Sequence, residues 1–156
     1  MRSMSAKVTG LHISGGGVPK TPVNVVNVTS NGCQGDDQAD KKHHGGKNKA
    51  ICLFQQEILD SLSANGHPIS PGSTGENILI KGIKIGSISI GTCLRIGDVE
   101  VIVTQDAPPC KTIRNSFVDG EFNKISHRKY PNFTRWYASV TLPGTIRVGD
   151  VVELIN

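Results

Sequence analysis

The chain has 156 residues, 37% of them apolar and 19% charged, with a formal net charge of +4. This length suits one domain of roughly 100–200 residues. The modest charge and the 4% content of aromatic residues argue against a nucleic-acid-binding surface. No apolar run approaches the roughly 18 residues that cross a bilayer, and no secretory signal precedes the four cysteines. We therefore expect a cytoplasmic protein with reduced thiols that binds neither membrane nor nucleic acid.

The chain opens with segments typical of a β protein. Residues 1–5 are expected to be a disordered start, and residues 6–156 to form a single domain. Apolar and polar residues partly alternate over 6–13 and 23–28, which predicts the first two strands. Residues 30–48 lack apolar periodicity and contain many glycines and charged residues, which predicts a long polar loop.

One segment has helical periodicity. Its apolar residues follow the i, i+3/i+4, i+7/i+8 pattern, which predicts the main α-helix near 49–64, with Asn48 as its N-cap and Gly66 as its terminator. Cys52 is then placed on this helix. The apolar residues of the pattern are Ala50, Ile51, Phe54, Ile58, Leu59 and Leu62.

The rest of the chain again favours strands. The Gly97-Asp98 pair predicts a tight hairpin turn, and Gly149-Asp150 repeats the same local pattern before a second apolar strand. We interpret this repetition as shared turn geometry. The expected strands are 77–80, 87–90, 92–96, 99–104, 136–142 and 145–155, with a short helix near 111–118. The fold class is therefore predicted to be mainly β, as a Greek-key-like barrel with one main helix.

Cys110 is the residue whose chemistry stands out. It follows a β-branched strand and two prolines, which donate no backbone hydrogen bond and would present the sulfur on a stiff loop. Lys111 and Arg114 lie next to it in sequence, and nearby cations favour the thiolate, the form that acts as nucleophile and metal ligand. An inert cysteine in a turn remains the alternative.

Two polar segments are further candidates. The loop 35–46 contains Asp36, Asp40 and His44, which would serve as metal ligands, line the site of an oxyanion-bearing ligand, or be solvated. The turn 71–77 would grip an anion with its amides or merely cap a hairpin. In that turn Glu76 would act as a general base or bond to local amides.

In this order, these segments resemble the MOSC domain family, named for the C-terminal region of molybdenum cofactor sulfurases, and this chain looks like a small stand-alone bacterial-type member. One position departs from the family pattern: an arginine is expected three residues before the cysteine, where this chain has Ala107. Lys111, Arg114 or Arg135 would then supply that charge, or the ligand differs. The matching elements are Gly35–Asp40, His44-Gly45-Gly46, Lys49-Ala50-Ile51, Gly75-Glu76-Asn77, Thr104-Gln105, Pro109-Cys110 and Trp136–Val140.

The resemblance implies a barrel like that of pyruvate kinase and a cysteine that carries sulfur as a persulfide or ligates the molybdenum of a pterin cofactor. Cys110 is then the catalytic residue or the metal ligand. Pyridoxal phosphate is expected on a partner, which would be a cysteine desulfurase or a protein similar to molybdenum cofactor sulfurase. The residues implied to bind the molybdopterin-type ligand are Asp36, Gln38, Asp40, His44, Gly45, Gly46, Gly75, Glu76, Asn77, Lys111 and Arg114.

Three hypotheses follow. In the first, Cys110 accepts sulfur for assembly of metal–sulfur clusters or of the molybdenum cofactor. In the second, the protein is a molybdenum-cofactor-dependent oxidoreductase that reduces N-hydroxylated compounds, with Cys110 as metal ligand. The third is a non-catalytic anion-binding barrel. The sequence leaves open whether the protein is an enzyme.

Overall fold

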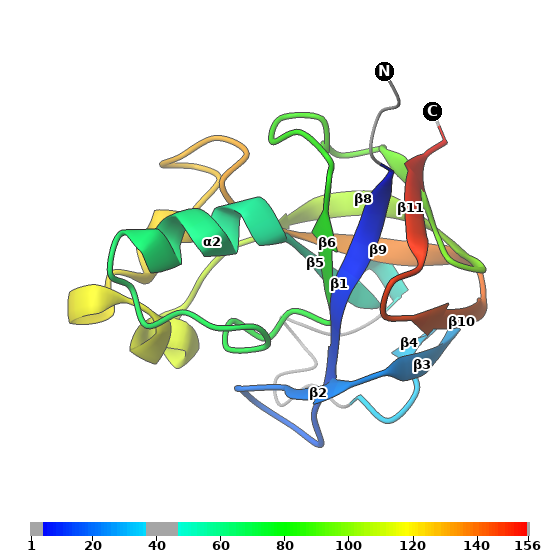
Figure 1. Cartoon of the computed structure of the whole chain (residues 1–156), viewed down its shortest axis with the longest axis horizontal. Helices are drawn as coiled ribbons and strands as arrows, with labels where there is room; N and C mark the ends of the chain where they lie inside the picture. The colour runs from blue at the N-terminus through cyan, green and yellow to red at the C-terminus, as the bar shows by residue number, and fades with distance from the viewer. Residues whose placement is uncertain (1–4, 37–46, 156) are drawn as a thin grey trace.

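The computed structural model describes residues 5–36 and 47–155, which form a β-barrel with a smaller sheet beside it and helices on one flank (Figure 1). The strands are β1 (Ala6–Ile13), β2 (Thr21–Val23), β3 (Val25–Thr29), β4 (Gly32–Cys33), β5 (Ile51–Gln55), β6 (Ile78–Lys81), β7 (Cys93–Ile96), β8 (Val99–Ala107), β9 (Arg135–Leu142), β10 (Gly144–Arg147) and β11 (Val151–Leu154). The helices are α2 (Gln56–Ala64) and the 3₁₀ turns η1 (Lys47–Lys49), η2 (Lys111–Ser116), η3 (Val118–Gly120) and η4 (Phe122–Ile125). The expected disordered start falls mostly on residues 1–4, outside the described residues.

Seven strands form the barrel in the order β11-β7-β8-β9-β5-β6-β1, and β11 pairs with β1 to close it. Only β5 and β6 pair in parallel; the other barrel pairs are antiparallel. A parallel pair needs a crossover connection, and α2 begins the one between β5 and β6. The expectation of a mainly β barrel is therefore confirmed, and the barrel is mixed.

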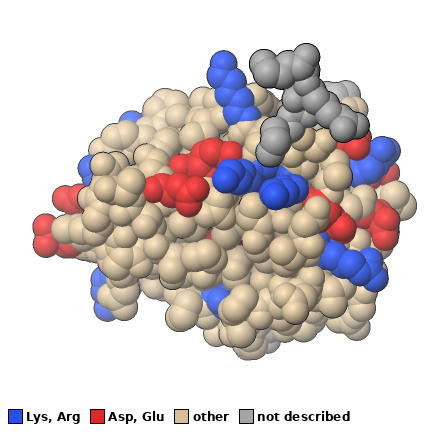
Figure 2. All heavy atoms as spheres, viewed as in Figure 1, with Lys and Arg blue, Asp and Glu red and all other residues tan. Residues whose placement is uncertain are grey.

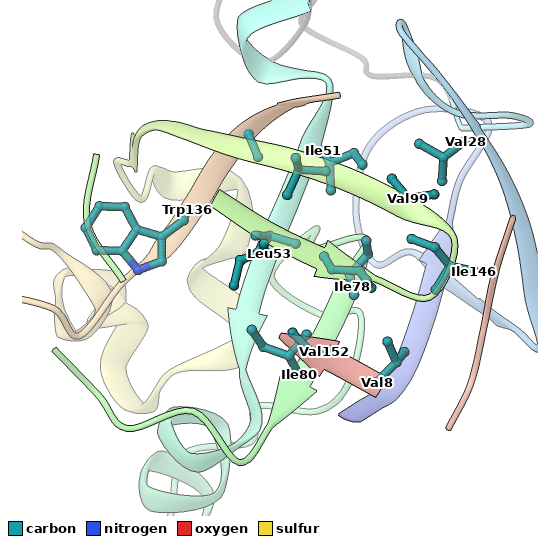
Figure 3. Close-up of a cluster of buried hydrophobic side chains, with 14 of the residues drawn as sticks. Val8, Val28, Ile51, Leu53, Ile78, Ile80, Val99, Trp136, Ile146 and Val152 are labelled. Atoms are coloured by element: carbon teal, nitrogen blue, oxygen red, sulfur yellow. The ribbon is translucent and has the colours of Figure 1, made fainter. Parts of the chain in front are cut away.

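Alternating burial places the apolar side chains inside the barrel. Along β8, Val99, Val101 and Val103 are buried, while the residues between them are partly exposed. This is the period-2 pattern of a strand with one face in the core. Figure 3 shows side chains from several strands and from β10 meeting in this core. Its largest buried side chains include Trp136, Ile51 and Leu53.

The predicted helix begins too early, because residues 51–55 form the strand β5. All five residues of β5 are buried, with Ile51 and Leu53 in the barrel core and Phe54 in a second core outside it. A strand buried on both faces shows no alternation and cannot be told from a helix by periodicity. Cys52 therefore lies on a strand.

The ends of this segment also differ in part from the prediction. Asn48 lies in η1, and the N-cap of α2 is Gln55, which makes no side-chain capping hydrogen bond. The end of the helix is as predicted: Asn65 is the C-cap and Gly66 follows with a positive φ of 91°. A glycine in this conformation is a common helix terminator.

A second apolar cluster holds α2 against the barrel. Ile58, Leu59 and Leu62 on the inner face of α2 pack with Phe54 of β5 and with the 3₁₀ turns after Cys110. Ile113 and Ile125 of those turns contribute to this cluster, as does Phe117 between η2 and η3. The short helix expected near 111–118 thus exists as 3₁₀ turns, and its buried side chains anchor the segment that follows Cys110.

Three predicted strands need correction. The strand predicted at 23–28 is split, because β2 pairs with β1 while β3 pairs with β10. The strand predicted at 145–155 is split for the same reason, into β10 in the small sheet and β11 in the barrel. Residues 87–90 form no strand but an irregular segment, and Ile88 within it is buried in the barrel core.

The two Gly-Asp turns pack against each other. Gly97 and Gly149 both have positive φ, 56° and 95°. The Gly97 amide donates to Val151 O at 3.1 Å, and a Cβ added to Gly97 would collide with the Asp150 carboxylate. The repeated sequence pattern thus marks two similar turns that meet at one end of the barrel.

Charges of both signs are interspersed on the face drawn in Figure 2, without a continuous basic stripe. Such mixed charge generates no strong attraction for a polyanion on that face. Within the part of the chain that the structure describes, no helix is long and apolar enough to span a membrane.

Replacement of Leu53 by alanine tests the barrel core. Leu53 is fully buried, so Leu53→Ala should lower the free energy of unfolding by about 2–5 kcal/mol. Leu142 is 47% exposed, and Leu142→Ala should change the free energy of unfolding by about 0.5 kcal/mol or less. Urea unfolding followed by circular dichroism measures both, and equal losses would contradict this assignment of the core.

Candidate functional site

The Pro71–Asn77 turn packs tightly on the segment that leads from β1 into β2. Gly72 and Gly75 have positive φ values of 83° and 81°. A Cβ added to Gly72 would lie 2.5 Å from Lys20 O, and one added to Gly75 would lie 2.9 Å from a methyl group of Val18. Both glycines are therefore required by close packing and backbone conformation, whatever the turn binds.

The turn encloses the chain's own carboxylate. Glu76 is fully buried and accepts hydrogen bonds from the Gly72 amide at 2.7 Å and from the Thr74 hydroxyl at 2.6 Å. The turn thus grips an anion that is part of the protein. Between the two interpretations of Glu76, this geometry favours local bonding over a role as general base.

Asp36 forms a buried ion pair with Lys20. The Lys20 ammonium lies 2.7 Å from Asp36 Oδ2, and both side chains are only 5% exposed. The Ser14 amide donates to Asp36 Oδ1 at 2.9 Å, and the Asn77 side chain donates to Oδ2 at 3.0 Å. Asp36 and the Gly75-Glu76-Asn77 element therefore meet, as expected of one site.

The remaining residues predicted in the polar loop lie outside the described residues. They are Gln38, Asp40, His44, Gly45 and Gly46. Within residues 5–36 and 47–155, no group of three or more His, Cys, Asp or Glu side chains is arranged to hold a metal ion. Asp36, the described member of the proposed metal set, is already paired with a cation.

Cys110 is partly exposed at the end of the loop that follows β8. Its Sγ lies 2.8 Å from the Thr112 hydroxyl, which can donate a hydrogen bond to a thiolate. Its carbonyl accepts from the Ile113 amide at 3.2 Å, and the Ile113 side chain is buried. The sulfur is thus accessible, while the residues after it are anchored in the second core.

Lys111 and Arg114 lie beside Cys110 and are both exposed. Arg114 donates to Lys111 O at 3.1 Å. Their charges face solvent, where screening weakens their effect on a neighbouring group.

Arg135 joins the cysteine loop to the glycine-rich turn. It is 5% exposed and donates to Thr74 O at 2.7 Å, to Ala107 O at 3.2 Å and to Pro108 O at 3.3 Å. The Ser116 hydroxyl adds a second link, 2.8 Å from the hydroxyl of a serine in the same turn. The cysteine loop, the turn and Asp36 are therefore connected by direct hydrogen bonds.

Strand register explains the position of Arg135. Ala107 on β8 and Arg135 on β9 are directly paired, so the arginine extends from the strand next to the position where the family pattern expects one. Ala107 is fully buried and packs with Cys52 and Tyr137. Of the three cations considered for that charge, Arg135 is the buried one.

Two of the other cysteines are unsuited to ionisation. Burial, with a contribution from Asp36, raises the pKa of Cys33 to about 12. Burial raises the pKa of Cys52 to about 11, although the Arg135 charge opposes this shift. Both thus remain thiols at neutral pH, while Cys93 and Cys110 are partly exposed. All four cysteines are free in the structure.

His12, which the sequence did not single out, lies within the same polar network. It is 2% exposed, and its Nδ1 has no hydrogen-bond partner among the described residues. Burial lowers the pKa of His12; Glu76 opposes this shift and Lys20 adds to it. Its ring lies against Gly72, where an added Cβ would be 3.0 Å from Cδ2.

The sequence of the site also matches a known family. The model of the MOSC domain matches residues 40–153, which is more than half of the chain. The chain belongs to the MOSC domain family. It is 28% identical over 145 residues to the Bacillus subtilis "Uncharacterized protein YflK", covering 90% of this chain and 63% of that protein. It is 25% identical over 133 residues to the Escherichia coli "Protein YiiM", covering 83% of this chain and 58% of that protein.

This MOSC domain protein therefore spans about three fifths of the length of these curated relatives. Solved structures share its fold. YiiM from Geobacillus stearothermophilus superimposes with a TM-score of 0.75 at 21% identity, over 97% of this chain and 75% of that one. The YUAD protein from Bacillus subtilis gives 0.72 at 17% identity, over 97% and 96%.

The buried imidazole predicts an acid-dependent loss of stability. Because the folded-state pKa of His12 is lowered, the unfolded chain binds more protons as pH falls through about 6.5, and unfolding is favoured. The stability that neutral His12 contributes is fully present above that pH. It is lost completely once the pH is below the folded-state pKa of His12. The slope from one group is at most about 1.4 kcal/mol per pH unit. Urea unfolding of wild type and His12→Asn at pH 8, 7, 6 and 5 should give a shallower pH dependence for the variant, and equal slopes would contradict it.

Proposed function

We propose that this MOSC domain protein is a sulfur carrier that accepts sulfur on Cys110 for metal–sulfur or molybdenum cofactor assembly. The observation that carries the proposal is the difference among its thiols. Cys110 is partly exposed beside the Thr112 hydroxyl and on an anchored loop, whereas Cys33 and Cys52 are buried with raised pKa values. Only an accessible thiolate can react with a sulfur donor on another protein.

The proposed step is a thiol–persulfide exchange. The Cys110 thiolate attacks the outer sulfur of a cysteine persulfide on the donor protein. A sulfur–sulfur bond forms at Cys110, the donor's sulfur–sulfur bond breaks, and the donor cysteine leaves as its thiolate. Sulfur moves with no external oxidant, and the donor would be a desulfurase that uses pyridoxal phosphate. Lys20, the buried lysine of this site, is paired with Asp36 and so is not a free amine for pyridoxal phosphate.

A second candidate function is binding of molybdenum through the same sulfur, as in an oxidoreductase acting on N-hydroxylated compounds. The donor chemistry fits, because an accessible thiolate on a rigid loop suits a thiophilic metal. Cys110 would hold the metal, and the exposed Lys111 and Arg114 would face the anionic part of a pterin. When bound, the cofactor would supply two-electron redox chemistry.

Sulfur transfer is tested by mass spectrometry of the intact protein. After incubation with a cysteine desulfurase and cysteine, the wild type should gain about 32 Da, the mass of one sulfur atom. Cys110→Ala should lose this gain. Cys93→Ala removes the other partly exposed thiol and should retain it. An unmodified wild type, or a Cys110→Ala variant that still gains sulfur, would reject the carrier proposal.

Metal analysis tests the second candidate. The protein purified from a host that makes molybdenum cofactor is analysed for molybdenum by plasma mass spectrometry. A carrier should contain less than about a tenth of an equivalent, while a molybdenum protein should contain close to one equivalent that Cys110→Ala abolishes. Molybdenum retained in Cys110→Ala would show that the sulfur is not its ligand.

A further inference from the structure

Arg135 is a buried cation that forms no ion pair with a carboxylate of residues 5–36 or 47–155. All three of its described hydrogen-bond acceptors are backbone carbonyls: those of Thr74, Ala107 and Pro108. Its Nε is buried and has no hydrogen-bond partner among the described residues. Buried charges in proteins are generally paired, so this arrangement calls for an explanation.

The nearest linked carboxylate does not form an ion pair with it. Glu76 bonds to the Thr74 hydroxyl, while Arg135 bonds to the carbonyl of the same residue. Among the described side chains, none of the ion pairs within 4.0 Å includes Arg135. The two buried side chains are thus linked through Thr74 without a direct ion pair.

Arg135 binds the chain two residues before Cys110. Its Nη2 is 3.3 Å from Pro108 O, and Pro108 and Cys110 are two residues apart, which spans at most about 7 Å. With the length of the Pro108 carbonyl added, the guanidinium lies within about 13 Å of the Cys110 Cα, which is between one and two Debye lengths at physiological ionic strength. A buried charge is also screened less than the exposed charges of Lys111 and Arg114.

We propose that Arg135 is the positioning residue of the cysteine loop, and that its buried charge, which no carboxylate among the described residues pairs, makes Cys110 react preferentially with anionic partners. The guanidinium fixes the loop through two carbonyls and ties it to the Thr74 turn through a third. Its remaining positive potential favours a negatively charged reactant, such as an ionised persulfide. This inference rests on the proposed function, because it concerns the same sulfur.

Two alkylating reagents of different charge test the proposal. Iodoacetate is an anion and iodoacetamide is neutral, and both attack the same thiolate. The ratio of their rate constants at Cys110, measured at pH 7 by mass analysis of the Cys110 peptide, therefore reports the local potential. Arg135→Gln should lower this ratio about two- to fivefold, as expected for removing one charge at this range. A merely structural role would change both rates by the same factor.

Two variants complete the design. Arg135→Lys keeps the charge but has no planar fork, so it should preserve the ratio even where the absolute rates change. Arg147→Gln removes one exposed positive charge on β10 and should leave the ratio within about 1.3-fold of wild type, because an exposed charge is screened. An unchanged ratio in folded Arg135→Gln would overturn the proposal.

A further variant covers the case in which Arg135→Gln does not fold. With Lys111 and Arg114 both changed to glutamine, the protein should keep at least half of the wild-type ratio if the buried charge is its source. Loss of the preference in that variant would overturn the proposal. The sulfur-transfer test is separate: Cys110 that takes up no sulfur but shows the Arg135-dependent ratio would reject the carrier function alone.

Discussion

The structure depends on the side chain of Asn77, which extends two strand pairings at once. Its backbone amide donates to Cys52 O on β5, while its side-chain oxygen accepts from the Cys52 amide at 3.0 Å. Its backbone carbonyl accepts from the His12 amide on β1, while its side-chain NH₂ donates to His12 O at 3.2 Å and to Asp36. Buried backbone groups must be paired, and the amide side chain offers the one acceptor and two N–H donors that these contacts use. The same residue therefore joins the barrel to the buried ion pair.

From Asn77 the polar network reaches the loop of Cys110 through a few contacts. Glu76 accepts from the Gly72 amide and the Thr74 hydroxyl, the Thr74 carbonyl accepts from Arg135, and Arg135 also donates to the carbonyls before Cys110. Each buried polar group in such a network contributes only when its partners are in place, because an unpaired group loses its hydration without compensation. A change far from the cysteine, at Asn77 or Lys20, would therefore alter the loop that presents the sulfur.

Sequence patterns could identify the elements whose signals are local. The strand β1, the hairpin at Gly97-Asp98 and the end of α2 at Gly66 were all predictable, because alternation and turn glycines act over a few residues. The prediction of a helix over the residues of β5 was wrong, because this strand is buried on both faces and shows no alternation. At the site, motif resemblance pointed to Asp36, Gly75–Asn77 and Cys110. His12 and Lys20 gave no signal, since their role depends on contacts with residues remote in the chain.

Arg135 shows why resemblance alone leaves the site incomplete. The missing arginine at position 107 implied a lost contact, but the register of β8 and β9 puts Arg135 opposite Ala107. A small side chain at 107 lets Cys52 and Tyr137 pack against it, while the arginine approaches the loop from the neighbouring strand and binds its carbonyls. An arginine at position 135 on β9 can thus take the place of one at position 107 on β8, while the loop that bears the cysteine stays anchored. The guanidinium is held by backbone groups before Cys110, and none of the described ion pairs includes it, which is why the proposed effect of its charge concerns the reactants of Cys110.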